Sequence, residues 1–507
     1  MRICMVSDFF YPSIGGVEEH VYNLSQMLLA LGHKVVVLTH AYGDCSGVRY
    51  VTHGLKVYYL PIKVCYNQCI LPTAICNVPM LRAVLLREQV DVVHGHSAFS
   101  ALAHEALMVG SLLGLKVSQQ RDVLFSTFYK RFSLQTVFTD HSLFGFADLS
   151  AALTNKLLEI NLSMVNHAIC VSHIGKENTV LRARVAKHRV SVIPNAVDTA
   201  LFTPDPNRRP DNGVINIVVA SRLVYRKGID LLAGVIPRFK KTPNVNFIIV
   251  GDGPKRDLLE EIREKTNMQD RVEILGAVEH AKVRDVLVRG HIFVNTSLTE
   301  AYCMAIVEAA SCGLQVVSTS VGGIPEVLPN SLILLTEPDI EAIYSAILVA
   351  IERHRSIESS TSTATSTTAS NGHIPPKTET NCRSKRSRRR KKQGTDVPSM
   401  PSTASVTTIA PDSANKTEPV LCPYRCNELV ETLYNWEDVA LRTAKVYERV
   451  MKERAFTLSE LIYAVYQCGA WFLAFLVVGH FMLRLLECWR PRSRIEVAYE
   501  PRSQKGL

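Results

Sequence analysis

The chain has 507 residues, which is too long for one ordinary hydrophobic core, so we expect two or three domains. Hydrophobic residues make up 47% and charged residues 21%, a composition that is typical of globular proteins and excludes wholesale disorder. The net charge is +10, but eight positive charges lie between Arg383 and Lys392, which leaves about +2 for the remainder. We therefore expect no broad basic surface and no nucleic-acid partner.

The first 200 residues alternate short apolar runs with helical patterns. The expected strands are 3–6, 34–39, 56–60, 90–94, 136–139 and 168–172. The expected helices cover 18–31, 78–86 and 97–113. Strands that alternate with helices form right-handed βαβ units, so residues 1–200 are predicted to be a Rossmann-like domain. The first run is too short for a secretory signal, and the thirteen cysteines have no framework spacing, which together favour a cytosolic face.

A second set of buried strands follows. The expected strands are 215–220, 246–251, 272–275, 292–296, 315–318 and 331–335. Residues 201–355 are thus predicted to be a second Rossmann-like domain. The predicted fold is α/β, with two doubly wound parallel sheets whose carboxyl strand ends face each other across a cleft.

The composition changes after this second domain. Residues 356–420 are rich in Ser and Thr and contain the basic run, so we predict a disordered linker. The basic run is compatible with a nuclear signal, a tether to anionic lipid or a solvated linker. Helical spacing returns at 421–455, where we expect a helix packed on the catalytic body.

The next segment is apolar. Ala464–Leu483 carries no formal charge and is long enough to cross a membrane as one helix, which predicts a transmembrane helix at 464–484 and a short tail at 485–507. A buried core helix is the alternative. The charges on either side do not fix the orientation of the helix.

Short motifs of glycine or basic residues follow strands in both domains. Gly15 and Gly16 lie between the first strand and the first helix, where the backbone could approach a phosphate or a sugar. In the second domain, Arg222 and Lys227 stand five positions apart after strand 215–220, within reach of a diphosphate. Gly251 and Gly253 form a turn after the next strand.

Two glutamates frame the strongest motif. Glu300 and Glu308 are eight positions apart, which places both on one side of a helix if that helix starts at Glu300. One carboxylate could then bind a sugar and the other a ribose diol. Glu326 belongs to a glycine loop that follows the next strand.

In this order the motifs resemble family 4 of the retaining glycosyltransferases, which have the two-domain GT-B architecture. The resemblance spans about Arg2 to Arg355. Residues 139–148, 221–230 and 290–329 are similar to the catalytic subunits of phosphatidylinositol N-acetylglucosaminyltransferases. The resemblance implies transfer of N-acetylglucosamine from UDP-N-acetylglucosamine to phosphatidylinositol, the first step of glycosylphosphatidylinositol (GPI) anchor synthesis. It also implies a multi-subunit complex and a single span in the endoplasmic reticulum membrane, with the catalytic domain cytoplasmic.

The resemblance assigns roles to individual residues, with the first domain as the acceptor domain and the second as the nucleotide-sugar domain. The catalytic residues that it implies are Arg222 and Lys227 on the diphosphate, and Glu300 and His141 near the donor sugar. The donor-binding residues that it implies are Glu308 on the ribose, Gly15 and Gly16 in the cleft, and Gly251, Gly253 and Glu326. It implies no metal and no cofactor besides the donor substrate.

The segment from Lys116 to Leu134 departs from the family pattern. In the family pattern, the residues on either side of this segment follow one another directly. The segment begins with Lys-Val-Ser, which the end of an exon followed by a splice-donor sequence can encode. We interpret residues 116–134 as an unspliced intron in the gene sequence. Detection of the peptide Asp122–Lys130 in the native protein would contradict this interpretation.

Three other functions stay open. One is a family 4 enzyme with another lipid or glycan acceptor, because the motifs define mainly the nucleotide end. Another is a non-catalytic scaffold of a membrane complex, which the intact Arg222, Lys227, Glu300 and Glu308 disfavour. The third is a nucleic-acid binder that acts through the basic run.

Overall fold

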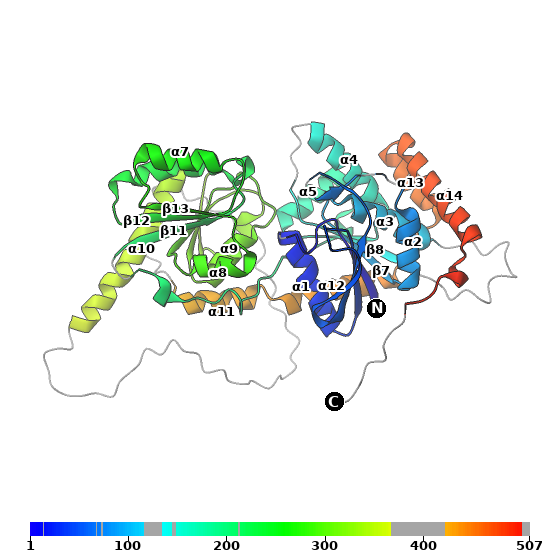
Figure 1. Cartoon of the computed structure of the whole chain (residues 1–507), viewed down its shortest axis with the longest axis horizontal. Helices are drawn as coiled ribbons and strands as arrows, with labels where there is room; N and C mark the ends of the chain where they lie inside the picture. The colour runs from blue at the N-terminus through cyan, green and yellow to red at the C-terminus, as the bar shows by residue number, and fades with distance from the viewer. Residues whose placement is uncertain are drawn as a thin grey trace, which may run out of the picture. The chain divides into compact units, whose positions relative to one another are not determined.

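The computed structural model describes residues 1–115, 134–143, 149–210, 213–366 and 421–498, except positions 14, 67, 72 and 74. The chain divides into two compact units (Figure 1). Unit 1 comprises Met1–Ala196, Glu300–Tyr302 and Tyr434–Leu507, and unit 2 comprises Val197–Thr299 and Cys303–Leu433. Residues 116–133, nearly all of the segment interpreted as an intron, lie outside the described residues, and so does most of the predicted linker.

Unit 1 is built on an eight-stranded sheet with the order β10-β9-β8-β7-β1-β2-β4-β3. The strands are β1 (Arg2–Val6), β2 (Lys34–His40), β3 (Gly47–Val51), β4 (Leu55–Leu60), β7 (Val92–His96), β8 (Gln135–Asp140), β9 (His167–Cys170) and β10 (Val190–Val192). All neighbouring strands are parallel except β3, which pairs antiparallel with β4 at the edge. A separate hairpin joins β5 (Val64–Tyr66) and β6 (Cys69–Ile70).

Helices pack against this sheet. They are α1 (Gly16–Ala30), α2 (Val78–Arg87), α3 (Ala101–Leu113), α4 (Leu149–Ser163) and α5 (His173–Ala183). Strands of a parallel sheet that is covered on both faces are buried on both faces, so β1 and β2 are almost continuously apolar. The core includes Val6, Leu38, Val93 and Phe138, all fully buried.

Unit 2 contains a six-stranded parallel sheet with the order β13-β12-β11-β14-β15-β16, the arrangement of a Rossmann fold. The strands are β11 (Ile215–Ala220), β12 (Val245–Val250), β13 (Val272–Gly276), β14 (Ile292–Asn295), β15 (Gln315–Thr319) and β16 (Ile333–Thr336). The helices are α6 (Ile229–Val235), α7 (Arg256–Thr266), α8 (His280–Leu287), α9 (Met304–Ser311) and α10 (Ile340–Ser366). Figure 1 shows α7 on one side of this sheet and α8 and α9 on the other.

The end of α10 corrects one predicted boundary. The linker was expected to begin at 356, but α10 continues to Ser366. Extending a helix that has already formed requires no new nucleus, so a helix can continue into a segment of this composition. Residues 367–420 of the predicted linker lie outside the described part of the chain.

The prediction of a single helix at 421–455 is also wrong. Two helices occupy this region, α11 (Pro423–Leu433) in unit 2 and α12 (Trp436–Lys452) in unit 1. The break falls at Asn435, which has an extended backbone and caps α12 by accepting a hydrogen bond from the Asp438 N–H at 2.7 Å.

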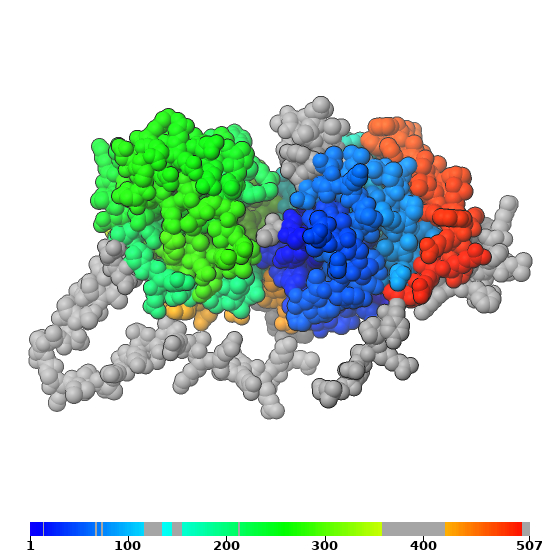
Figure 2. All heavy atoms as spheres, viewed as in Figure 1, coloured from blue at the N-terminus to red at the C-terminus, as the bar shows by residue number. Residues whose placement is uncertain are grey.

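The predicted transmembrane helix starts later than 464. Ala464 belongs to α13 (Leu458–Cys468), which ends because Gly469 has φ 145°, outside the helical region. A short turn, Ala470–Phe472, then leads into α14 (Leu473–Trp489). Within the described residues, Ala470–Trp489 is the one helix that is long and apolar enough to cross a membrane. Figure 2 shows α13 and α14, in orange and red, on the surface of unit 1.

Candidate active site

In unit 1, Gly15 and Gly16 lie between β1 and the first turn of α1. A Cβ atom on Gly15 would lie 2.6 Å from Oε2 of Glu18, so a larger residue would displace this carboxylate. The Ser13 hydroxyl donates to the same carboxylate at 3.2 Å. The loop therefore brings backbone and a carboxylate together at a helix N-terminus, where partial positive charge also favours an anionic ligand.

His141 follows the carboxyl end of β8 and is half-buried. Its loop is fixed by Asp140, whose carboxylate accepts hydrogen bonds from the Ser142 N–H and the Thr179 hydroxyl, each at 3.0 Å. Nε2 of His141 lies 3.4 Å from Nδ1 of His96, and its ring centroid lies 4.7 Å from that of His20. His141 is thus one member of a histidine cluster.

The remaining members come from two further elements, and a third element contributes a hydrogen-bond partner. His20 is in α1, and its Nδ1 lies 2.8 Å from Oδ1 of Asn195. His94 lies in the middle of β7 and His96 ends it, with ring centroids 4.1 Å apart. Tyr447 of α12 lies 2.7 Å from Nδ1 of His94. We refer to His20, His94, His96 and His141 as the histidine cluster.

Burial controls the charge of this cluster. It lowers the pKa of His20 to about 4 and holds the pKa values of His94, His96 and His141 well below the ordinary value, with the neighbouring histidines adding to the effect in the last three. The rings are therefore neutral near pH 7. One nitrogen each of His20, His96 and His141 lies within 4.8 Å of the others, a spacing at which a divalent ion could be held. The expectation of no metal stays a prediction.

In unit 2, the loop after β11 carries Arg222, which is exposed, and Lys227, which is half-buried. It ends at Gly228, where φ is 65° and a Cβ atom would lie 1.8 Å from the Thr296 carbonyl oxygen. Only glycine fits this turn. Both basic residues therefore stand at the carboxyl edge of the unit 2 sheet, where α/β folds bind ligands.

The glycine turn at Gly251 and Gly253 packs against the same loop. The Leu223 N–H donates to the Asp252 carbonyl at 2.9 Å, and the Lys255 N–H donates to the Leu223 carbonyl at 2.9 Å. The two motifs, which are about thirty positions apart in the sequence, thus form one surface.

Glu308 lies in α9 with only 6% of its surface exposed. Its Oε1 is 3.0 Å from Nε2 of His280 at the start of α8. The predicted placement of Glu300 on the same helix is wrong, because α9 starts at Met304, after Cys303 with a left-handed φ of 70°. Glu300 instead precedes the helix and groups with unit 1.

Glu326 lies in the short helix Ile324–Glu326, which follows β15, and its side chain is exposed. The structure thus gives every predicted site residue a place, but it leaves their roles as predictions. Sequence reasoning missed His20, His94, His96 and His280. One signal was available, because His20 is four positions after Gly16 and so one helical turn from the glycine loop.

Two known families match the chain. Residues 40–129 match the family described as PIGA (GPI anchor biosynthesis), and residues 215–353 match glycosyl transferases group 1. Among solved structures, a sucrose-phosphate synthase from Thermosynechococcus elongatus has a TM-score of 0.60 at 18% identity, covering 88% of this chain and 98% of that one. HepE from Anabaena, in complex with UDP, has a TM-score of 0.58 at 14% identity, covering 89% of this chain and 100% of that one. These likenesses confirm the GT-B fold.

Curated relatives match at much higher identity. A phosphatidylinositol N-acetylglucosaminyltransferase subunit from Homo sapiens is 48% identical over 100% of this chain and 89% of its own length. The corresponding subunit from Arabidopsis thaliana is 45% identical over 98% of this chain and 94% of its own length. The chain therefore belongs to the PIGA family of phosphatidylinositol N-acetylglucosaminyltransferase subunits, the glycosyltransferases of GPI-anchor biosynthesis.

Proposed function

We propose that the chain transfers N-acetylglucosamine from UDP-N-acetylglucosamine to phosphatidylinositol, the first step of GPI-anchor biosynthesis. The observation that carries this proposal is the 48% identity to a relative named for that sugar and that lipid, over the whole of this chain. The two loops that meet in unit 2 and the buried Glu308 provide polar groups of the kind that a nucleotide sugar requires.

In this proposal, unit 2 binds the donor. Arg222 and Lys227 neutralise the diphosphate, whose negative charge grows as it leaves, so no divalent metal is needed. Glu308 accepts hydrogen bonds from the ribose hydroxyls, and its orientation is held by His280 at 3.0 Å. Gly251 and Gly253 shape the surface beside the diphosphate, while Glu326 lies at the rim of the donor site.

Unit 1 and Glu300 act on the sugar and the acceptor. Glu300 and His141 face the donor sugar, and the neutral ring of His141 offers a hydrogen bond without adding charge. Gly15 and Gly16 lie near the diphosphate of the donor and the acceptor. The acceptor hydroxyl attacks the face from which the phosphate departs, and a phosphate oxygen accepts its proton, which retains the anomeric configuration. A glycosyl adduct isolated on a protein side chain would contradict this mechanism.

We also propose that the chain works as one subunit of a complex in the endoplasmic reticulum membrane, with the catalytic units on the cytoplasmic side. The helix Ala470–Trp489 supports a single membrane span. The relatives are themselves named as subunits, which supports an assembly.

The test is transfer of radiolabelled N-acetylglucosamine to phosphatidylinositol in membranes that lack the endogenous activity and are complemented with this chain. Arg222→Ala and Glu308→Ala are expected to abolish the lipid product. Arg226→Ala is the matched control, because Arg226 is also exposed and lies in the same loop as Arg222. The control is expected to retain activity.

Other outcomes select between the remaining functions. Hydrolysis of UDP-N-acetylglucosamine without a phosphatidylinositol product, lost in both site variants, would indicate another acceptor. Restoration of the endogenous activity by the Arg222→Ala and Glu308→Ala variants as well as by the wild-type chain would indicate a scaffold whose own site is not used.

A further inference from the structure

A second polar site lies in unit 1, at the amino-terminal ends of strands β9 and β10. It is a pocket of about 420 Å³. Its lining residues are Asn166, His167, His188, Arg189, Arg449, Glu453, Arg454 and Phe456. His167 begins β9 and Arg189 precedes β10, whereas His141 follows the carboxyl end of β8. Because β8, β9 and β10 are parallel, this pocket and His141 lie at opposite ends of the strands.

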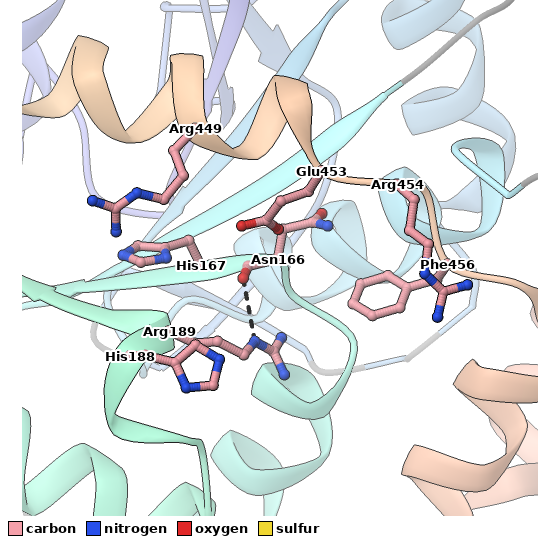
Figure 3. Close-up of a pocket in the computed structure, with 8 residues that line it drawn as sticks. All are labelled: Asn166, His167, His188, Arg189, Arg449, Glu453, Arg454 and Phe456. Atoms are coloured by element: carbon pink, nitrogen blue, oxygen red, sulfur yellow. Dashed lines mark hydrogen bonds between the residues drawn. The ribbon is translucent and has the colours of Figure 1, made fainter.

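Two layers of the fold build the pocket, as Figure 3 shows. Arg449 of α12 and Glu453, the residue that follows this helix, lie on one side, and His167, His188 and Arg189 lie on the other. Arg189 is fixed by hydrogen bonds from its guanidinium to the carbonyl oxygens of Val165 and Asn166, the latter at 3.2 Å. These bonds orient the Arg189 side chain before any ligand binds.

The lining carries more positive than negative charge, because three arginines face one glutamate. Arg454 is already paired with Glu460 outside the pocket. The guanidinium of Arg449 makes no hydrogen bond or ion pair with any residue that the structure describes, although Arg449 adjoins His167 and Glu453. A surplus positive charge with unused N–H donors favours an anionic ligand.

The ring of His167 responds to this charge. Burial first, and then the charges of Arg449 and Arg189, lower the pKa of His167 to about 4. His167 is therefore neutral near pH 7. Its Nε2 already lies 2.9 Å from the Ser191 hydroxyl, which orients the ring. An anion in the pocket would offset the repulsion between these groups.

The pocket also adjoins the apolar helices. Phe456 lines it, and Thr457, the next residue, caps α13. Large apolar side chains of α13, of α14 and of the short turn between them are exposed, including Tyr463 at 65%, Trp489 at 80% and, in the turn, Trp471 at 69%. Aromatic residues at helix ends are typical of the membrane interface, which is the depth at which lipid phosphates lie.

We propose that this pocket is a binding site for a phosphate group, with Arg449 and Arg189 as its principal donors. The site is separate from the candidate active site and does not depend on the proposed reaction. The phosphate could belong to the headgroup of an anionic membrane lipid or be a free phosphate ion, and the chemistry of recognition is the same for both.

The test uses the full chain in neutral detergent and follows its unfolding temperature during titration with two probes. One probe is inorganic phosphate, and the other is a short-chain phosphatidic acid, which is not the proposed acceptor. A ligand that binds only the folded state raises the unfolding temperature in a saturable way. We expect Arg449→Gln to weaken the apparent affinity about tenfold, because one charge-assisted contact to phosphate is lost.

Lys445→Gln is the matched control. Lys445 is exposed on the same helix, one turn before Arg449, and does not line the pocket. It is expected to bind as the wild-type chain does. Without ligand, both variants should unfold at the wild-type temperature, because neither side chain is buried.

The two probes separate the sources of phosphate. A response to phosphatidic acid but not to inorganic phosphate assigns the site to a lipid headgroup, and equal responses assign it to the free ion. The absence of a saturable response to either probe overturns the proposal. Equal weakening by Arg449→Gln and Lys445→Gln also overturns it, because that result indicates a general effect of net charge.

Discussion

The hydroxyl group of Tyr447 lies 2.7 Å from Nδ1 of His94, although 353 positions separate the two residues. Tyr447 belongs to α12 and is fully buried, while His94 lies in β7 near the middle of the unit 1 sheet. The other ring nitrogen of His94 lies 2.7 Å from the Thr139 hydroxyl. The C-terminal segment thus completes the hydrogen bonding of His94, one member of the histidine cluster.

Tyr447→Phe is expected to destabilise unit 1. The substitution leaves Nδ1 of His94 buried without its partner, which costs about 1–3 kcal/mol. The unfolding temperature of the full chain in detergent measures the effect. Tyr463→Phe removes a hydroxyl from a side chain that is 65% exposed and should leave the temperature unchanged. Equal unfolding temperatures for Tyr447→Phe and wild type would show that this hydrogen bond contributes nothing.

Acidification is expected to destabilise the protein through the same cluster. The pKa of His20 is about 4 in the folded chain and about 6.5 when the ring is exposed. The unfolded chain therefore binds a proton that the folded chain does not, and the contribution of His20 to stability, complete above about pH 6.5, is lost as the pH falls towards 4.

Substitution of His20 tests this dependence. His20→Gln removes the titrating ring, so the fall in unfolding temperature between about pH 7 and pH 5 should be smaller than in wild type. His173→Gln is the control, because His173 is exposed and lies outside the cluster. An unchanged pH dependence in His20→Gln would show that His20 binds protons equally in both states.

The sequence predicted the parallel sheets better than their edges. All six strands expected in unit 2 are present, because buried parallel strands are continuous apolar runs. Two strands of the unit 1 sheet were missed, and so was the separate hairpin of β5 and β6. β3 is an exposed antiparallel edge without an apolar run, and β10 has only three residues. The kink at Gly469 was missed because the residues on both sides of it are apolar.

The candidate site was predictable only in part. Motifs that follow a strand, such as Arg222 and Lys227, could be placed at a sheet edge from the pattern alone. The contacts of His141 could not, because its neighbours come from α1 and β7, which meet only in the folded unit. His280 was missed for the same reason, since α8 and α9 bring it to Glu308 across 28 positions.

Deletion of residues 116–134 is expected to leave a folded and active chain. The two ends of the segment are close together, because a Cβ atom on Gly114 would lie 2.3 Å from the Leu134 carbonyl oxygen. Joining Leu115 directly to Gln135 therefore closes a short gap between α3 and β8. The phosphatidylinositol transfer assay measures activity. A deletion variant that is folded but inactive, beside an active full chain, would show that the segment is functional.

Gly228→Ala is expected to lower transferase activity by at least about tenfold, because a small displacement of binding groups is costly in catalysis. The added methyl group meets the Thr296 carbonyl oxygen at 1.8 Å, so the loop that carries Arg222 and Lys227 must move. The strain of alanine in a left-handed backbone conformation is not expected to cause this loss of activity by itself.

Gly213→Ala separates the two effects. Gly213 has a φ of 71°, close to the 65° of Gly228, but a Cβ atom there would meet nothing within 4 Å. Gly213→Ala should therefore lose only a little stability, about 1 kcal/mol, and keep its activity. Equal activity in Gly228→Ala and Gly213→Ala would show that the position of the Arg222 loop does not limit transfer. A loss confined to Gly228→Ala, with a raised KM for UDP-N-acetylglucosamine, would place the loop at the donor.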